Sequence, residues 1–485
     1  MPAAPAPATT DGGGRLVGVL ALAGIVAALM QTLVVPLIGD LPNLLRTTAS
    51  DASWVITATL LAAAVATPVA GRLGDMYGKR RLLLASTAPL VAGSVVCALS
   101  SSVAPMVVGR GLQGLGMGVV PLGISLLRDV LPPEKLGSSI ALMSASMGVG
   151  GALGLPFSAA VAEHASWRVL FWVAAALSLL VGVLVHLFAP AGPVAPSGGR
   201  FDALGAVGLG GGLVALLLAV SKGSVWGWGS ATTLGLLAAA AVVLLAWGTW
   251  ELRTRDPLVD LRTTARPQVL MTNAASVLVG FAMYAQSLVV PQLLQLPEAT
   301  GYGLGRSMMA MGLWMAPAGL MMMALAPLGA KLSAARGPKV TLAVGSLVIA
   351  VGYASSLLLM GSTWGLLAVT LVCNTGVGLA YGAMPALIMG AVPQHETASA
   401  NSFNTLMRSI GSSVSAAVIG VVLAQLTTDF GGHPLPSEDG FRVAMLVGGG
   451  VALAAALVAS LIPVRPAPAP GAPAGKPAPA AETAA

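Results

Sequence analysis

Charged side chains are scarce in this sequence. Asp, Glu, Lys and Arg together make up 8% of its 485 residues, whereas 56% of the residues are hydrophobic. A soluble globular protein carries about three times this share of charge. Because water cannot accommodate so much apolar surface, the composition excludes a soluble fold and indicates a polytopic membrane protein.

Cysteine is nearly absent, and so are the motifs of common enzyme sites. Cys97 and Cys373 lie far apart in apolar runs, so we expect neither a disulfide framework nor a metal site. The sequence has no Gly-x-Ser-Gly, no His-Glu-x-x-His, no cluster of acids and no Gly-x-x-x-x-Gly-Lys-Ser/Thr loop. We therefore expect no cofactor and no enzymatic activity, neither that of an intramembrane peptidase nor that of an ATP-driven pump.

What the sequence does contain is a series of long apolar runs separated by short polar turns. Each has about 20 residues, the length that crosses a bilayer as a helix. The runs are residues 15–38, 52–73, 82–101, 104–127, 139–162, 168–189, 203–221, 231–250, 267–291, 305–328, 340–360, 364–389, 401–425 and 441–463. They predict an all-α polytopic membrane protein with 14 transmembrane helices. The first run is too long for the core of a signal peptide and is expected to be retained.

Basic residues are distributed unevenly among the turns. If both termini lie in the cytoplasm, seventeen of the 24 Lys and Arg fall in cytoplasmic segments and five on the opposite face. This asymmetry follows the positive-inside rule and predicts a multi-pass protein with cytoplasmic termini. It also accounts for the net charge of +7 without a nucleic-acid partner. The abundance of Ala, Gly, Leu, Val and Pro favours a bacterial source, and hence the bacterial cytoplasmic membrane.

An internal repeat divides the chain. Residues 31–36 return as 286–291, residues 71–80 return in altered form as 330–339, and a glycine pair near position 114 returns 264 residues later. The order is the same in both halves, which predicts a parallel repeat of two pseudo-symmetric six-helix bundles with a two-helix insertion. The predicted units are a six-helix bundle at 1–189, a linker with two inserted helices at 190–266, a second six-helix bundle at 267–463 and a disordered cytoplasmic tail at 464–485. Two similar halves without a soluble domain are typical of a transporter, whose cavity between the halves opens alternately to each side of the bilayer. We expect a monomer.

One polar turn, between the second and third runs, combines glycines with charges. Its sequence is Gly-Arg-Leu-Gly-Asp-Met-Tyr-Gly-Lys-Arg-Arg, from position 71 to position 81. The glycines suit a tight backbone reversal, and the acid can cap a helix or accept from a neighbouring Arg. The string resembles the motif G-x-L-[AG]-D-x-x-G-[RK]-[RK] of major facilitator superfamily transporters and meets it at every position. We interpret it as a conformational latch comprising Gly71, Arg72, Gly74, Asp75, Gly78, Lys79 and Arg80.

The run 104–127 contains an arginine, Arg110, followed by Gln113, Gly114 and Gly118. A guanidinium within a membrane span either snorkels to the surface or faces a partner, and the second case marks a functional site. The two glycines lie one turn apart and allow a second backbone to approach closely. The string resembles the superfamily pattern R-x-x-Q-G-x-G, which implies a role of Arg110 and Gln113 in proton transfer or substrate contact.

The run 139–162 carries small residues and a proline, including Gly150, Gly154 and Pro156. It is similar in part to the antiporter signature G-x-x-x-G-P-x-x-G-G, with the proline one residue late; ordinary helix packing is the alternative explanation. The Trp-Arg-x-x-Phe string at 167–171 and the division into six, two and six helices resemble the fourteen-helix drug-proton antiporter branch. The resemblance implies export of drug-like or antibiotic-like organic molecules in exchange for protons.

Polar exceptions in the apolar runs are expected to line the substrate cavity. They are Gln31, Gln113, Asn273, Tyr284, Gln286, Asn374 and Arg408. Two arginines in the spans favour a neutral or anionic organic substrate. None of the seventeen Asp and Glu falls clearly at mid-membrane depth, which leaves Asp75, Glu163, His164 or His186 as proton carriers. The missing carboxylate keeps an alternative open, an importer or uniporter of a small metabolite that is not coupled to protons.

Overall fold

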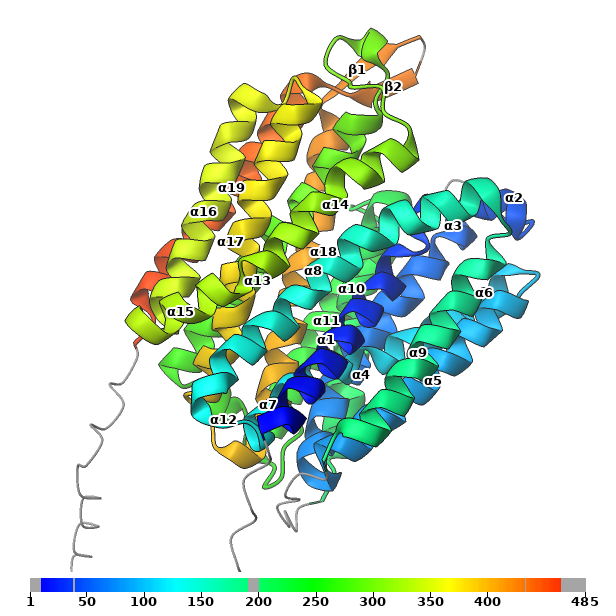
Figure 1. Cartoon of the computed structure of the whole chain (residues 1–485). Helices are drawn as coiled ribbons and strands as arrows, with labels where there is room; N and C mark the ends of the chain where they lie inside the picture. Colours follow the sequence, from blue (N-terminus) through cyan, green and yellow to red (C-terminus); the bar gives the residue numbers. More distant parts are fainter. Residues whose placement is uncertain (1–9, 38–39, 191–199, 432, 464–485) are drawn as a thin grey trace, which may run out of the picture.

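The computed structural model describes residues 10–37, 40–190, 200–431 and 433–463, and helices dominate it (Figure 1). In this part of the chain fourteen segments are long and apolar enough to cross a membrane, which confirms the predicted number. The spanning segments are α1 (Thr10–Thr32), α4 (Trp54–Tyr77), α5 (Lys79–Leu99), α6 with α7 (Val103–Leu115 and Val119–Val130), α8 (Pro133–His164), α9 (Arg168–Phe188), α10 (Ala203–Trp226), α11 (Ala231–Arg253), α13 (Pro267–Gln295), α14 with α15 (Met308–Ala324 and Ala326–Arg336), α16 (Pro338–Leu359), α17 (Thr363–Met389), α18 (Thr397–Gln425) and α19 (Glu438–Leu461). The short elements are η1 (Val35–Leu37), α2 (Leu41–Leu44), α3 (Ala49–Ala52), η2 (Gly116–Gly118), α12 (Leu261–Thr264), η3 (Glu298–Thr300), η4 (Gln394–Glu396) and the antiparallel hairpin of β1 (Thr427–Phe430) and β2 (His433–Pro436).

Two of the spans are interrupted where the sequence weakens the helix. A 3-10 turn at Gly116–Gly118 separates α6 from α7, because two glycines lower helix propensity at that point. Leu325 separates α14 from α15. Pro327 follows two residues later, and its ring and missing N–H prevent a regular bond to the carbonyl of Met323.

The spanning helices form two bundles, each with its own hydrophobic core. One core draws almost entirely on α1 and α4 to α9, and the other on α13 to α19. Figure 1 shows the first bundle in blue to teal and the second in green to red-orange. The bundles meet through α8 against α14 and α17, and through α4 and α7 against α18. The predicted pair of six-helix bundles with a two-helix insertion is therefore confirmed.

The inserted helices α10 and α11 pack against each other, and α10 also contacts both bundles, through α4 and α18. A small separate core joins them, in which Leu209, Leu213 and Trp247 of the insertion meet Ala64 of α4 and Phe403 of α18. The insertion thus touches one helix of each bundle. The tail 464–485 and residues 191–199 of the linker lie outside the described residues, so the domain borders stay predictions.

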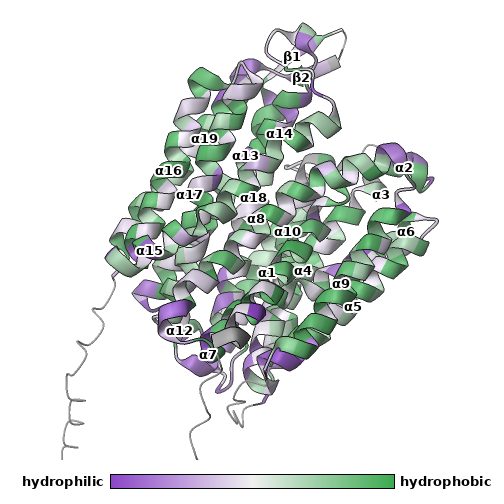
Figure 2. Ribbon diagram, viewed as in Figure 1, coloured by the Kyte–Doolittle hydropathy of each residue, from purple (hydrophilic) through white to green (hydrophobic). Residues whose placement is uncertain are grey.

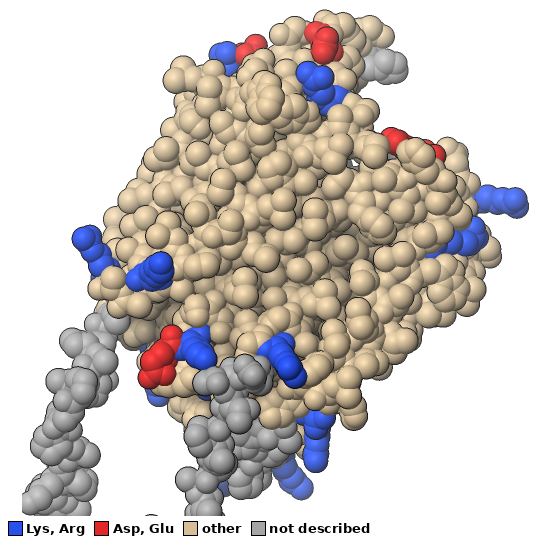
Figure 3. Space-filling view, viewed as in Figure 1, with Lys and Arg blue, Asp and Glu red and all other residues tan. Residues whose placement is uncertain are grey.

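Polar residues gather at the two ends of the bundles. Figure 2 shows hydrophobic ribbon along the middle of the helices, and in Figure 3 the charged side chains of the visible face lie toward the ends, separated by an uncharged belt. We call the end where α4 passes into α5 the Asp75 end, and the opposite end, which carries β1 and β2, the hairpin end. The start of α1 and the last residues of α19 both point toward the Asp75 end (Figure 1).

The turn at the Asp75 end is shorter than the glycine pattern suggests. Helix α4 continues to Tyr77, and only Gly78, with φ of 99°, breaks the backbone before α5. Gly71 and Gly74 are helical, so the expectation that all three glycines serve the reversal is wrong. A Cβ at Gly71 would lie 2.3 Å from Ser402 Oγ, and one at Gly74 2.4 Å from a methyl group of Leu122. These two glycines therefore allow neighbouring helices to approach.

The glycines named for packing lie at close helix contacts. A Cβ at Gly114 would meet the carbonyl oxygen of Thr59 at 2.5 Å, and one at Gly118 would lie 2.7 Å from Ala70 Cβ. In α8, a Cβ at Gly150 would lie 2.2 Å from Ile25 O, and one at Gly154 2.0 Å from Thr32 Oγ1. Pro156 lies against Gly312 of the second bundle. At each of these positions a larger side chain would force a displacement, most severely where the obstacle is backbone.

A pair of glycines on α18 tests this packing. A Cβ at Gly411 would lie 1.9 Å from Val277 O, whereas the position of Gly420 is open. We expect Gly411→Ala to destabilise the second bundle by about 1–3 kcal/mol, because α13 and α18 must separate. Gly420→Ala should leave stability unchanged or raise it by up to about 1 kcal/mol, since alanine favours a helix. Thermal unfolding in detergent measures both variants, and equal melting temperatures would contradict the prediction.

Candidate functional site

A carboxylate of the first bundle caps a helix of the second. Asp75, in the last turn of α4, is 8% exposed. Its two oxygens accept hydrogen bonds from the backbone N–H groups of Ala398 (3.1 Å) and Ser399 (2.8 Å), in the first turn of α18. These N–H groups have no partner within their own helix, and the positive end of the helix dipole favours a negative charge there. Asp75 therefore joins the two bundles at one end.

Other charged residues surround this contact. Lys79 Nζ lies 3.9 Å from Asp75 Oδ1 and 2.6 Å from Asp129 Oδ2. Arg128 donates to Thr397 Oγ1 at 2.7 Å, and Gln394 donates to Asp129 Oδ1 at 3.3 Å, so both links cross between the bundles. Together Asp75, Lys79, Arg128 and Asp129, with the first turn of α18, form what we call the inter-bundle contact.

Sequence reasoning missed two members of this group, and two residues that it named form no hydrogen bond between the bundles among the described residues. Arg128 and Asp129 were not assigned a role, although two adjacent charges at the end of an apolar run were a visible signal. Arg80 donates to His186 O of its own bundle at 2.7 Å. Arg72 Nε is buried without a hydrogen-bond partner among the described residues.

Arg110 lies inside the first bundle, where it is 2% exposed. It does not snorkel: its guanidinium donates to Val55 O (3.2 Å), Met30 O (2.8 Å) and Gln113 Oε1 (2.7 Å). Gln113 in turn donates to Ser94 Oγ at 2.8 Å. The group links α1, α4, α5 and α6 near the hairpin end. Participation of Arg110 and Gln113 in proton transfer or substrate contact stays a prediction.

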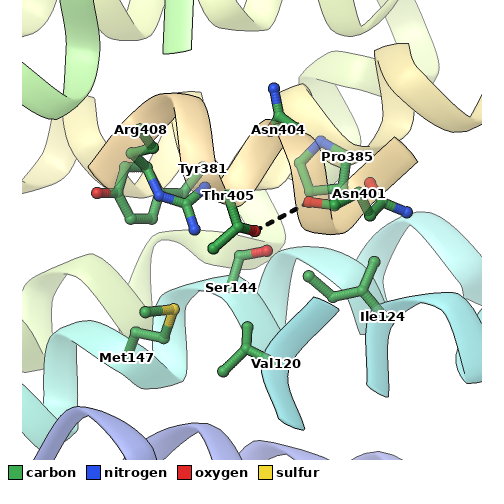
Figure 4. Close-up of a pocket in the computed structure, with 10 residues that line it drawn as sticks. All are labelled: Val120, Ile124, Ser144, Met147, Tyr381, Pro385, Asn401, Asn404, Thr405 and Arg408. Carbon is green, nitrogen blue, oxygen red and sulfur yellow. Dashed lines mark hydrogen bonds between the residues drawn. The ribbon is translucent and has the colours of Figure 1, made fainter. Parts of the chain in front are cut away.

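A cavity lies between the bundles (Figure 4). It is small, about 10 Å³, which is room for about one water molecule, and it is bordered by side chains of α7 and α8 on one side and of α17 and α18 on the other. The lining residues are Val120, Ile124, Ser144, Met147, Tyr381, Pro385, Asn401, Asn404, Thr405 and Arg408. Arg408 is the one charged residue among these ten, and its guanidinium carbon lies 4.4 Å from the centre of the Tyr381 ring.

Polar groups of this cavity differ in how well they are satisfied. Asn404 donates to Asn273 Oδ1 at 2.9 Å. Thr405 donates to the backbone carbonyl of Asn401 at 3.0 Å, and Figure 4 shows this bond as a dashed line. Ser144 Oγ and Asn401 Oδ1 are buried and have no hydrogen-bond partner among the described residues. A cation over an aromatic ring and two unsatisfied oxygens suit an organic molecule with hydrogen-bonding groups.

The structure brings together only part of the residue set predicted to line a cavity. Arg408 lies on the cavity, and Asn273 lies behind it through its bond to Asn404. Gln31 is exposed and points to Met117, whereas Asn374 donates to Thr370 O of its own helix. Tyr284 is half-buried and Gln286 is buried on α13, and neither lines this cavity. Sequence polarity alone did not separate the positions that face the cavity from those that face a neighbouring helix.

Comparison with known sequences agrees with this architecture. The model of the Major Facilitator Superfamily matches residues 20–416. An uncharacterized MFS-type transporter of Mycobacterium tuberculosis is 34% identical over 300 residues. The match covers 61% of this chain but only 43% of that relative, which is less than half of the longer protein. The tetracenomycin C resistance and export protein of Streptomyces glaucescens is 30% identical over 402 residues, 79% of this chain and 71% of that protein.

Solved structures share the fold at low sequence identity. The human organic anion transporter MFSD10 matches with a TM-score of 0.63 at 15% identity and covers 92% of this chain and 99% of its own. The proton:xylose symporter XylE matches with a TM-score of 0.64 at 14% identity, over 94% of this chain and 96% of its own. With fourteen spans, two bundles and a matching family model over most of its length, the chain belongs to the Major Facilitator Superfamily.

Proposed function

We propose that the protein is a secondary active transporter that exports drug-like or antibiotic-like organic molecules across the bacterial cytoplasmic membrane. The observation that carries this proposal is the cavity between the bundles, which holds one cation and no carboxylate among its lining residues. The similarity to a tetracenomycin C resistance and export protein supports the substrate class. We further propose that the Asp75 end faces the cytoplasm, that protons are the counter-ion and that the monomer is the working unit.

In this mechanism the inter-bundle contact closes the cytoplasmic end of the cavity. Each charge-assisted hydrogen bond between Asp75 and the first turn of α18 contributes about 1.5–3 kcal/mol. These bonds are strong enough to hold the state that is closed at the Asp75 end, and they are weak enough to be exchanged for bonds to water when the bundles separate. The seven latch residues predicted from sequence remain part of the proposal, with Arg128 and Asp129 added to them.

Inverted membrane vesicles test the whole proposal. A substrate of the exporter should accumulate inside such vesicles when their interior is made acidic, and collapse of the pH gradient should release it. A panel of neutral, anionic and cationic drugs, screened by deletion and overexpression, would supply the substrate. Transport that equilibrates the compound but never accumulates it would instead indicate the importer or uniporter alternative, which the lack of a carboxylate among the cavity residues favours.

The inter-bundle contact yields a sharp mutational test. Asp75→Asn keeps the shape of the side chain but can accept only one of the two backbone N–H groups and loses the attraction to Lys79. We expect export to fall about tenfold or more, because the state closed at this end loses at least about 1.4 kcal/mol. The measurement is the export rate divided by the amount of protein in the membrane. Glu134→Gln, which removes an exposed carboxylate at the same end, is the control and should export normally. Full activity of the Asp75 variant would contradict a latch.

Arg408 offers a test of substrate charge. Arg408→Gln removes the cation of the cavity but keeps a polar side chain, so export of anionic compounds should fall about tenfold while neutral compounds are affected less. Arg442→Gln is the control, since Arg442 forms an exposed ion pair with Glu438 at the hairpin end. Drug resistance of cells that express equal amounts of each variant gives the comparison.

Equal or better export of a lipophilic cation such as ethidium by the unmodified protein would contradict the neutral or anionic preference.

A further inference from the structure

Two carboxylates meet where the inserted helices approach the Asp75 end. Asp202 caps α10: it accepts from Gly205 N at 2.8 Å and from the indole nitrogen of Trp250 at 3.0 Å, and it is 9% exposed. Glu251 lies in the last turn of α11 and is 2% exposed. A Cβ at Gly205 would lie 2.3 Å from Asp202 Oδ2 and 2.7 Å from Glu251 Oε1. Both carboxylates therefore border the same point of α10.

The carboxylate of Glu251 has three N–H donors near it, but it has no cation and no well-aligned hydrogen bond among the described residues. The indole of Trp247 and the backbone N–H groups of Leu258 and Val259 surround it. Nevertheless, neither of its oxygens, nor the Trp247 indole nitrogen, forms a hydrogen bond among the described residues. A buried carboxylate with only poorly aligned donors and no cation is costly, and a second carboxylate nearby adds repulsion.

Charged groups on the neighbouring segments do not compensate this charge. The charged side chain that acts on Glu251 is that of Asp202, which has the same sign. Arg262 of α12 is directed to the carbonyl of Leu252, and Asp256 accepts from the backbone N–H of Arg200. A single proton held by the two carboxyl groups would remove the repulsion without any further ligand.

The segment that covers Glu251 is bonded to the inter-bundle contact. Ser399 Oγ donates to Leu258 O at 3.1 Å, and the backbone N–H of the same Ser399 donates to Asp75 at 2.8 Å. Helix α10 also packs against α4 and α18, the two helices that the contact joins. A change in how Leu258 and Val259 cover Glu251 is therefore felt directly at the first turn of α18.

We propose that Asp202 and Glu251 bind one proton between them and that its release opens the Asp75 end. When the pair is protonated, the segment at Leu258 stays closed over it and holds α18 against Asp75. When the proton leaves to water, two negative charges remain in a buried place, the covering segment moves away, and the inter-bundle contact weakens. Proton binding and the closed state then favour each other by linkage. The inference rests on the role proposed above for the inter-bundle contact, and it adds a ligand, the proton, and a site outside the cavity.

Hydrogen–deuterium exchange of the full chain in lipid tests the link without any substrate. After correction for the intrinsic effect of pH, peptides that contain Ala398 and Ser399 should be protected at about pH 6 and should lose at least about tenfold protection at about pH 8. In Glu251→Gln the new side chain is neutral at both pH values. The protection of these peptides should therefore persist at about pH 8 and differ less than about twofold from that at about pH 6. Asp202→Asn should behave likewise, since asparagine retains the helix cap.

Two controls make the result decisive. Glu134→Gln should follow the unmodified protein, and Glu251→Asp, which keeps a carboxyl group, should restore the dependence on pH. The infrared C=O band of a protonated carboxyl should disappear with rising pH in the unmodified protein and be missing in Glu251→Gln. The proposal is overturned if Glu251→Gln opens with pH as the unmodified protein does, or if the unmodified protein shows no dependence on pH. A failure to export any compound would count against the proposed function but would leave this exchange measurement intact.

Discussion

The hydrogen bonds from the first turn of α18 to Asp75 are the constraint on which the two-bundle arrangement depends at one end. Where the start of a helix is buried in protein, as it is for Ala398 and Ser399, water does not reach its free N–H groups, so another group of the protein must satisfy them. Here that group belongs to the other bundle. Once Asp75 is placed there, its charge has to be offset, and the two cations Lys79 and Arg128 do this for Asp75 and Asp129 together. Such a contact is specific, yet at the rim of the membrane water can replace it when the bundles part.

Close glycine packing complements this polar contact away from the ends. Few charges are available in this chain, so the helices associate mainly through backbone approach and small residues. The seam between α8 and α14 is built in this way: a Cβ at Gly319 would lie 2.3 Å from Gly148 O, and Gly312 lies against Pro156. Small residues dominate at these points, and the one large side chain there among the described residues is that of Met322 in α14, which lies against Gly148. The seam can therefore serve as the line along which one bundle tilts on the other, while each hydrophobic core moves as a unit.

Much of the fold could be predicted from the sequence, because each apolar run is long enough to identify a membrane-spanning helix. The number of spans, the repeat and the insertion depend on patterns that are local or regularly spaced. The contact partner of Asp75 could not be found in this way, since it lies 323 residues later and consists of backbone N–H groups that carry no sequence signal. Gly71 and Gly74 were misread because a glycine that permits a turn and a glycine that permits close packing look the same in a sequence. The burial of Glu251 could not be predicted either, because it depends on Leu258 and Val259 folding back over it.

Helix α18 connects the features that matter for the proposed transport. Its first turn binds Asp75 and, through Ser399, the segment above Glu251, while Arg408 on the same helix borders the cavity. Ten residues separate Ala398 from Arg408, which corresponds to about 15 Å along the helix axis. A regular helix over this distance behaves as a rod, so a tilt that frees its first turn also moves the guanidinium of Arg408 relative to α7 and α8. The cavity then needs no carboxylate of its own, because a proton bound near the end of the rod and a substrate bound beside its middle act on the same rigid element.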